Sequence, residues 1–455
     1  MLFHSPTFFI FFVLFLPGFF FLKSSYRLLY TAVASFIFYA WWYPPYLFLL
    51  IAFTVFAFYT ALIIVNCSNT AYKIILSACL LPLCFFKYTN FLLNNIFILL
   101  GKGRTDIGHW SLPLGISFIT FTVLAYLVDI RRGKYVAERS FTRVALYLSF
   151  FPHLIAGPIM RPRELFPQFA HLRLKPKLIK LGLLLFSVGL IKKILFADIL
   201  APFVDSVYQG SLPSNFVRST LAFYAFAVQI YCDFSGYVDM ALGLAFILGI
   251  RLPLNFNRPY LADSIVDFWR RWHMTLSRWL RDYLYIPLGG SRHGAGRTFL
   301  ALVITMLIGG LWHGAAWTFV LWGAYHGALL AFEHFAKTKG WGIEKLPLWV
   351  RRIVTFHLVC FGWIFFRAKG PEQMQRLLSG LLISDGWKGT LHASLFVVAL
   401  IVVFFLLHAF DRVSLFCWLA RRQRAVVIYG VFAVILLASM ALSVGNPSAF
   451  IYFDF

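Results

Sequence analysis

The sequence predicts an all-α protein that crosses a membrane several times, and its composition and hydropathy carry this prediction. Hydrophobic residues fill 61% of the 455 positions and charged residues only 13%, whereas soluble proteins carry about 25% charged residues. The mean hydropathy is +0.79, and apolar runs follow one another along almost the entire chain. Such a chain has room for about a dozen spans of roughly 20 residues each with short loops. A soluble fold is therefore excluded.

The apolar runs predict one membrane domain over residues 1–455, with N-terminal helices at about 1–105, a core at about 110–335 and C-terminal helices at about 349–455. Several runs are shorter than the roughly 20 residues of a clean span, so we expect tilted, broken or paired helices. The first run has no basic segment before it and no A-x-A site after it. This favours a membrane helix over a cleavable signal peptide.

Basic residues outnumber acidic ones, because 41 Lys and Arg against 17 Asp and Glu give a net charge of +24. In a soluble protein this excess would indicate nucleic-acid binding, but here the basic residues are dispersed among hydrophobic runs, so no nucleic-acid partner is expected. We interpret them as cytoplasmic loops that attract anionic lipid headgroups. The strongest basic loop contains Arg161, Arg163, Arg173, Lys175, Lys177 and Lys180.

The stretch from Asp263 to Gly327 concentrates charge, tryptophan and histidine in a chain that otherwise avoids charge, and the charged residues fill its first half. Ser264 and Asp267 have the spacing of a capping box, and no Gly or Pro follows until Pro287, so one continuous helix is predicted. Each central Arg or Asp against lipid tails would cost roughly 2.5 to 3.5 kcal/mol. We therefore expect this charged helix to be interfacial, re-entrant or buried in protein.

His273 lies on the apolar side of this predicted helix. Its neighbours at i−4, i+3 and i+7 are Trp269, Leu276 and Leu280. An ionisable group directed into a membrane protein is a candidate functional residue.

Two acidic residues, Asp233 and Asp239, stand in the otherwise apolar sequence QIYCDFSGYVDMALG. At membrane depth they need partners. We expect them to pair with arginines of the charged helix, a structural role that we favour over direct chemistry. The arginines in question are Arg270, Arg271 and Arg278.

A second histidine segment follows the charged stretch. Between Thr298 and Glu333 the only acids or bases are His313, which follows Trp312, and His326. The segment is long and apolar enough to span a membrane. A neutral histidine suits a general base, since its unperturbed pKa of about 6.5 lies near working pH. The alternative for His313 is a buried histidine bonded to a backbone carbonyl, and we interpret His326 as structural.

The pairing of DFWRRWH, which ends at His273, with LWHGAAW and AYHG resembles the membrane-bound O-acyltransferase family. In particular it resembles the bacterial branch that acetylates exported polysaccharides. Further motifs similar to that branch are LPLGISFITFTVLAYLVDIRRG at 112–133, FPHLIAGPIMRP at 151–162, QIYCDFSGYVDMALGLAFILGI at 229–250 and FIYFDF at 450–455.

This resemblance implies a bundle of about 11–13 membrane helices around a central funnel or tunnel, in the bacterial inner membrane. It implies His313 as the catalytic histidine and His273 as the second functional one. His153, in FPHLIAGP, is expected either to line the substrate path or to belong to the rim of a Pro-broken helix. The implied donor is a cytoplasmic thioester, acetyl-CoA, and the acetyl group passes across the membrane towards a polysaccharide. A periplasmic esterase-like acetyltransferase or acetyl acceptor protein is the implied partner.

Other chemistries lack their sequence signatures. No G-x-S-x-G, H-E-x-x-H, Walker or Rossmann pattern is present, and the six cysteines have no C-x-x-C spacing. We therefore expect no metal, no permanently bound cofactor and no covalent serine or cysteine catalysis. Two alternatives stay open: D-alanyl transfer to teichoic acid from a carrier protein, and a channel or transporter without catalysis. Two histidines on separate helices favour an enzyme, because a passive path needs no base.

Overall fold

The computed structural model describes residues 1–103, 111–170, 172, 175–384, 394–443 and 450–451. In these ranges the chain forms helices and no strands, which confirms the all-α prediction. It divides into two compact units that alternate along the sequence. The single-domain interpretation stays a prediction. Arg173 of the basic loop and residues 452–455 of the terminal motif lie outside the described part.

The multi-pass character of the protein is confirmed by its helices. Among the described residues, six helices are long and apolar enough to cross a membrane, or seven if one bent pair counts as a span. This number is below the expected 11–13, because several apolar helices are short, as is the 16-residue helix α1 (Pro6–Phe21). The six candidate spans are Tyr46–Ile63, Asn69–Leu99, Phe216–Ile247, Ala295–His313, Leu348–Arg367 and Ala425–Leu442.

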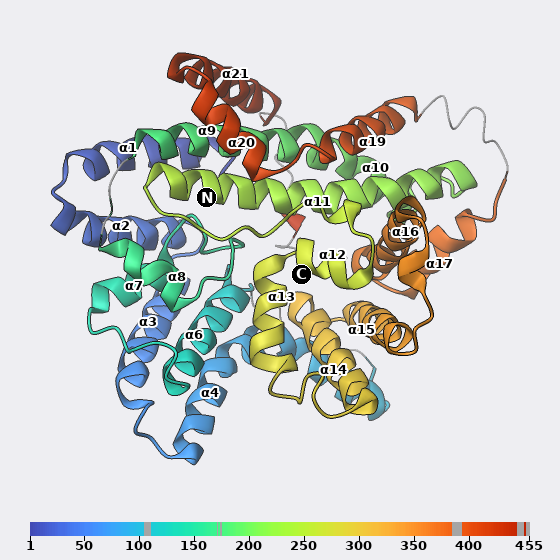
Figure 1. Cartoon of the computed structure of the whole chain (residues 1–455), viewed down its shortest axis with the longest axis horizontal. Coiled ribbons are helices and arrows are strands. Elements are labelled where there is room, and N and C mark those ends of the chain that lie inside the picture. Colours follow the sequence, from blue (N-terminus) through green and yellow to red (C-terminus); the bar gives the residue numbers. More distant parts are fainter. Residues whose placement is uncertain (104–110, 171, 173–174, 385–393, 444–449, 452–455) are drawn as a thin grey trace. The chain divides into compact units, whose positions relative to one another are not determined.

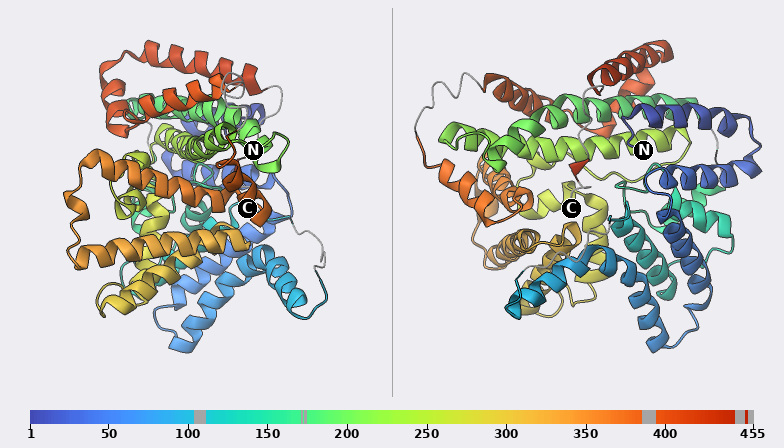
Figure 2. Two further views of the ribbon diagram at one scale, coloured as in Figure 1. Left: turned by 90° about the vertical axis from the view of Figure 1, so that its right-hand side faces the viewer. Right: turned by 180° about the vertical axis from the view of Figure 1, so that it is seen from behind.

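The first unit comprises Met1–Ser187, Tyr237–Pro253 and Gln423–Val444. Its first two helices form a hairpin (Figure 2, dark blue), in which the rings of Phe15 and Tyr30 stack at 5.2 Å. The helices wholly or mainly in this unit are α1, α2 (Ser24–Ala40), α3 (Tyr46–Ile63), α4 (Asn69–Leu83), η1 (Cys84–Tyr88), α5 (Thr89–Leu99), α6 (Ile116–Arg131), α7 (Phe141–Ser149), α8 (Pro162–Phe169), α9 (Pro176–Ile191) and α21 (Ala425–Ser443).

Two of the candidate spans leave most of their apolar surface uncovered by protein. Only 11% of the apolar window is buried in Asn69–Leu99, and the same holds for Ala425–Leu442. Such continuous apolar surface would be unstable in water. It is the surface that lipid tails cover.

The second unit comprises Val188–Gly236, Leu254–Arg422 and Gly445–Phe455, and it contains the two histidine motifs. The long helix α11 (Phe216–Ile247) passes from this unit into the first. The other helices of the unit are η2 (Lys192–Ala197), α10 (Asp198–Gln209), η3 (Pro259–Leu261), α12 (Ile265–Arg271), α13 (Met274–Leu280), η4 (Arg281–Tyr285), α14 (Ala295–His313), α15 (Trp317–Thr338), η5 (Ile343–Lys345), α16 (Leu348–Arg367), α17 (Pro371–Gly380), α19 (Leu395–His408) and α20 (Val413–Arg422).

Helices α14 and α15 form a tightly packed hairpin (Figure 1, yellow and orange). Their backbones approach each other through glycines. A Cβ atom on Gly310 would lie 2.2 Å from the carbonyl oxygen of Phe319, and one on Gly323 would lie 2.4 Å from that of Met306. Small residues at such a crossing let two helices pack closely without a hydrophobic driving force from water. The hairpin brings the end of α14 against the face of α15.

The charged stretch is not the continuous helix that the sequence predicts. Ser264 caps α12 as expected, because its Oγ accepts the Asp267 N–H at 3.0 Å. However, α12 ends at Arg271, and α13 begins only after His273. His273 has φ 41° and ψ 52°, the left-handed region that only glycine adopts readily. None of these short helices is among the candidate spans, in agreement with the expectation that the stretch does not cross the bilayer.

Candidate histidine site

The break at His273 is held by Asn255, which lies 18 positions earlier in the chain. The Asn255 carbonyl accepts the Met274 N–H at 2.9 Å, and its side-chain Oδ1 accepts both the N–H (3.1 Å) and the hydroxyl (2.9 Å) of Thr275. These bonds satisfy N–H groups that the first turn of α13 cannot satisfy within the helix. Asn255 therefore starts a new helix at the point where the old one would have continued.

The same Asn255 oxygen fixes the tautomer of His273. His273 Nδ1 lies 3.2 Å from Asn255 Oδ1. A backbone N–H can only donate, so the atom that receives the Thr275 N–H must be the amide oxygen, and His273 Nδ1 must donate to it. Burial lowers the pKa of His273 to about 3, because the charged imidazolium would lose its hydration. The neutral ring thus carries its lone pair on Nε2.

His313 is the last residue of α14 and is 4% exposed. Its ring is enclosed by aromatic side chains from three helices. The ring centroids lie 4.9 Å from Trp312, 5.0 Å from Trp322 and 5.2 Å from Phe366. Edge-to-face contacts of this kind contribute about 0.5–1.5 kcal/mol each beyond burial. They hold the ring in one orientation.

His326 lies on α15 and is fully buried between indole rings. It lies 4.9 Å from Trp322 and 5.3 Å from Trp269, measured between ring centroids. Neither ring nitrogen has a hydrogen-bond partner among the residues that the structure describes. The neighbouring helix α16 makes room with Gly362, since a Cβ atom there would lie 2.7 Å from His326 Nε2. A buried imidazole without hydrogen bonds destabilises the folded protein, so its presence points to a function.

Two tryptophans join the three histidines into one group. Trp312 contacts both His313 and His273, the latter at 5.9 Å between centroids, while Trp322 contacts both His313 and His326. All five residues belong to the second unit. We call this group the histidine–tryptophan cluster: His273, Trp312, His313, Trp322 and His326.

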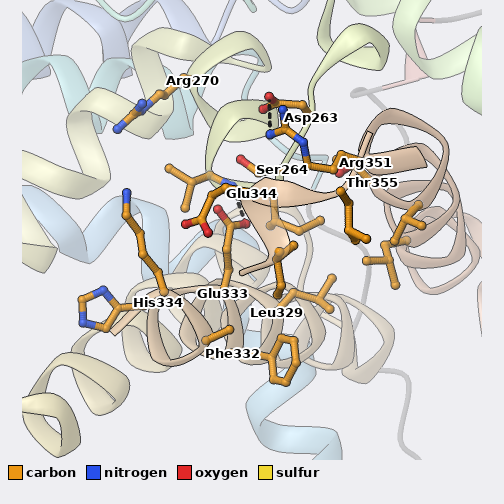
Figure 3. A pocket seen from close by; sticks show the side chains of 18 residues that line it. Asp263, Ser264, Arg270, Leu329, Phe332, Glu333, His334, Glu344, Arg351 and Thr355 are labelled. Carbon is orange, nitrogen blue, oxygen red and sulfur yellow. Dashed lines mark hydrogen bonds and ion pairs between the residues drawn. The ribbon is translucent and has the colours of Figure 1, made fainter. Parts of the chain in front are cut away.

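A cavity of about 510 Å³ lies beside this cluster in the same unit, between the start of α12, the end of α15 and the start of α16 (Figure 3). Three of its charged groups are already engaged: Asp263 pairs with Arg351 at 2.8 Å, and Glu333 accepts the Val266 N–H at 3.1 Å. Figure 3 shows Arg270 and His334 on one side and apolar side chains such as Phe332 on the other. The full lining is Asp263, Ser264, Ile265, Val266, Arg270, Leu329, Phe332, Glu333, His334, Ala336, Lys337, Ile343, Glu344, Leu346, Arg351, Val354, Thr355 and Leu358.

A comparison with known protein families identifies the family of this chain. Residues 68–339 match the model of the membrane-bound O-acyltransferase family, a range that includes every member of the cluster. The chain belongs to this family. It is therefore an acyltransferase, as the motifs predicted.

The chain is also similar to individual proteins whose activities are named. The chain is 41% identical to the probable alginate O-acetylase AlgI of Azotobacter vinelandii over 397 residues, covering 85% of this chain and 79% of the relative. It is 38% identical to the peptidoglycan O-acetyltransferase of Helicobacter pylori over 431 residues, covering 85% and 80%. It is 27% identical to the teichoic acid D-alanyltransferase of Bacillus subtilis over 271 residues, covering 56% and 69%.

In this O-acyltransferase the expected partner of Asp233 is wrong. Asp233 Oδ1 pairs with Lys193 at 2.8 Å, and its Oδ2 accepts the backbone N–H of Ile451 at 2.7 Å. Two arginines of the charged stretch lie as follows: Arg271 pairs with Asp267 at 2.8 Å, while the exposed Arg270 lines the cavity. The spacing of residues along one helix does not indicate that an acidic residue pairs with a lysine or a backbone N–H group from a distant segment.

The remaining predicted residues lie as follows. Arg278 is half-buried in α13 of the second unit. His153 is buried in the turn between α7 and α8, and Asp239 is half-buried on α11; both belong to the first unit. The structure thus joins His313 and His273 through Trp312, and His313 and His326 through Trp322. His153 and Asp239 belong to the first unit.

Three contributors to the site were missed in the sequence: Asn255, Trp322 and Gly362. Trp322 lies nine residues after His313 in the same apolar run. The spacing of aromatic residues along α15 could have indicated it. Asn255 and Gly362 have no such signal, because they act across the fold. Among the described residues, no group of three or more His, Cys, Asp or Glu side chains is arranged to hold a metal ion.

We predict that Asn255→Ala destabilises the protein by about 1–3 kcal/mol, because it leaves buried donors of His273 and Thr275 unsatisfied. It should also lower acyl transfer, since His273 loses its orientation. Thermal unfolding in detergent and a transfer assay measure both effects. Asn257→Ala, at an exposed position two residues later, is the control and should change neither. Equal stability and turnover in both variants would contradict the role of Asn255.

Proposed function

We propose that the protein is a bacterial inner-membrane O-acetyltransferase that moves an acetyl group from a cytoplasmic thioester donor, acetyl-CoA, towards a hydroxyl of an exported polysaccharide. The observation that carries this proposal is the burial of His273 and His313, from separate helices, with both rings in contact with Trp312. Two relatives that are named as O-acetylating enzymes of alginate and peptidoglycan support the acetyl group and the glycan acceptor.

His313 is the general base in this proposal. Acyl transfer from a thioester requires removal of the proton from the attacking hydroxyl as the new C–O bond forms and the C–S bond breaks. The rings of Trp312, Trp322 and Phe366 hold His313 in place, and a neutral imidazole is the form that accepts this proton. His273, whose lone pair lies on Nε2, assists by orienting the acceptor or relaying the proton.

Indole N–H groups can stabilise the charge that develops on the thioester oxygen. The Nε1 atoms of Trp269 and Trp322 are buried and have no hydrogen-bond partner among the described residues. Both rings contact His326. Donors that are fixed in a water-excluded site stabilise a developing oxyanion more than water does. In this reading Trp269 and Trp322 supply that stabilisation.

The cavity beside the cluster is the donor site in this proposal. Leu329 and Glu333 follow His326 by three and seven residues, so the cavity shares the His326 face of α15. Its basic residues Arg270 and Lys337 suit the phosphates of an acetyl-CoA donor, and its apolar wall suits the pantetheine arm. The excess of basic residues in the loops of the chain supports a donor that comes from the cytoplasm.

A periplasmic acetyl acceptor protein or esterase-like acetyltransferase is the proposed partner on the other side of the membrane. D-alanyl transfer is less well supported, because the D-alanyltransferase relative matches only 56% of this chain, at 27% identity. A passive channel is less well supported because the chain belongs to an acyltransferase family.

We predict that His313→Ala leaves the protein folded but lowers acetyl transfer about 10²–10⁴-fold, the usual contribution of a general base. His273→Ala should also lower the turnover, and the double variant should lose less than the product of the two effects, because both groups act on one step. His357→Ala is the matched control, since His357 lies exposed on α16 outside the cluster. The rate of radiolabelled acetyl transfer by the purified variants measures these effects. Near-normal turnover in His313→Ala would exclude His313 as the base.

We predict that the double variant Arg270→Gln/Lys337→Gln raises the KM for acetyl-CoA about tenfold or more with little change in kcat, because it removes binding contacts far from the transferred acetyl group. Arg352→Gln/Lys345→Gln removes the same charge from exposed positions outside the cavity lining and is the control. A KM that stays unchanged in the first variant, or rises equally in both, would place the donor elsewhere.

A further inference from the structure

Two consecutive buried lysines begin the π-helical segment η2 and bind different acidic residues. Lys192 pairs with Asp411 at 2.6 Å, and Lys193 pairs with both Asp233 at 2.8 Å and Asp198 at 2.7 Å. The side chains of Lys193 and Asp233 are each only 3% exposed. Breaking a buried pair of this kind leaves an uncompensated charge, which is strongly unfavourable. Asp233 is therefore held at a fixed place.

Asp233 in turn holds the end of the described chain. Its Oδ2 accepts the Ile451 N–H at 2.7 Å, a contact between residues 218 positions apart. Both Phe450 and Ile451 are buried, at 2% and 8% exposure. The carboxylate thus fixes a C-terminal segment that lies within the protein and not on its surface.

This C-terminal segment is connected to the histidine site through one ring. Phe234, the residue after Asp233 on α11, contacts Phe450 at 6.0 Å between centroids. It also contacts His273 edge-to-face at 4.8 Å, with an angle of 82° between the ring planes. Phe234 is fully buried, so it cannot move without a neighbour moving as well.

His273 depends on such support more than an ordinary helical residue does. Its positive φ is a conformation that costs about 1–3 kcal/mol and persists only where the surroundings enforce it. Asn255 holds Nδ1 on one side, and the rings of Trp312 and Phe234 contact the imidazole elsewhere. Of these supports, the Phe234 ring is itself in contact with Phe450 of the C-terminal segment.

We infer that the Lys193–Asp233 pair and the C-terminal residues Phe450 and Ile451 form a positioning device for His273, acting through the ring of Phe234. The inference rests on the proposed role of His273 in acetyl transfer. None of these residues touches the reacting groups in this account. They set the orientation of the imidazole that does.

Phe450→Ala and Asp233→Asn test the device in the full-length protein. Each should lower kcat about tenfold or more, the scale of a misplaced catalytic group, while the KM for acetyl-CoA stays within about twofold. Phe450→Leu, which keeps most of the apolar volume, should restore most of the kcat. Asp411→Asn is the matched control: it breaks the adjacent lysine's ion pair, which does not hold the Phe450–Phe234 contact, and should lower the unfolding temperature while sparing kcat.

Two further measurements separate positioning from general stabilisation. In a His273→Ala background, Phe450→Ala should lower kcat no further, because the group that it positions is gone. Hydrogen–deuterium exchange of residues 272–276 should become faster in Phe450→Ala and not in Asp411→Asn, and this readout does not depend on any acetyl transfer. A full additional loss of kcat in the double variant, or unchanged exchange in Phe450→Ala, would overturn the inference. Absent transfer by the wild-type protein would instead refute the proposed function and leave the exchange result decisive for the device.

Discussion

The interruption of the charged helix at His273 is the constraint on which the site depends. A continuous helix would satisfy the backbone N–H groups of Met274 and Thr275 within itself and would place the histidine one regular turn from Trp269. Instead Asn255 accepts hydrogen bonds from the N–H groups of Met274 and Thr275, and the helix is interrupted at His273, which lies in the left-handed region. The gain is a histidine whose ring orientation and tautomer are both fixed by one amide oxygen. A loop could reach the same place but would not hold the ring as rigidly.

Tryptophan rings connect this fixed histidine to the rest of the site. Trp312 contacts the rings of His273 and His313 across two separate chain segments, and the glycine-mediated approach of α14 and α15 brings Trp322 against His313. Bulky, apolar neighbours keep imidazoles neutral and exclude water from a thioester. The tryptophan rings also carry N–H groups, so they both exclude water from the site and offer hydrogen-bond donors.

The sequence allowed the fold class and the family to be predicted, because these depend on local composition and on short patterns. The roles of the histidines stay predictions. Ser264 as a helix cap is a local example. It did not allow the helix break, because the cause lies in Asn255, which no periodicity connects to His273. It also led to the wrong partner for Asp233: the charged stretch holds the densest group of arginines in the sequence, but Lys193 lies beside Asp233 in the fold. Contacts between segments far apart in the chain depend on tertiary packing, and a single sequence carries little signal for them.

A structure of the protein with a non-hydrolysable acetyl-CoA analogue bound would test the central claim most directly. If the histidine–tryptophan cluster is the transfer centre, the acetyl carbonyl will lie beside His313 with its oxygen directed to an indole N–H, and the phosphates will lie among Arg270 and Lys337. An analogue whose acetyl group contacts none of His273, His313 and His326 would contradict the account.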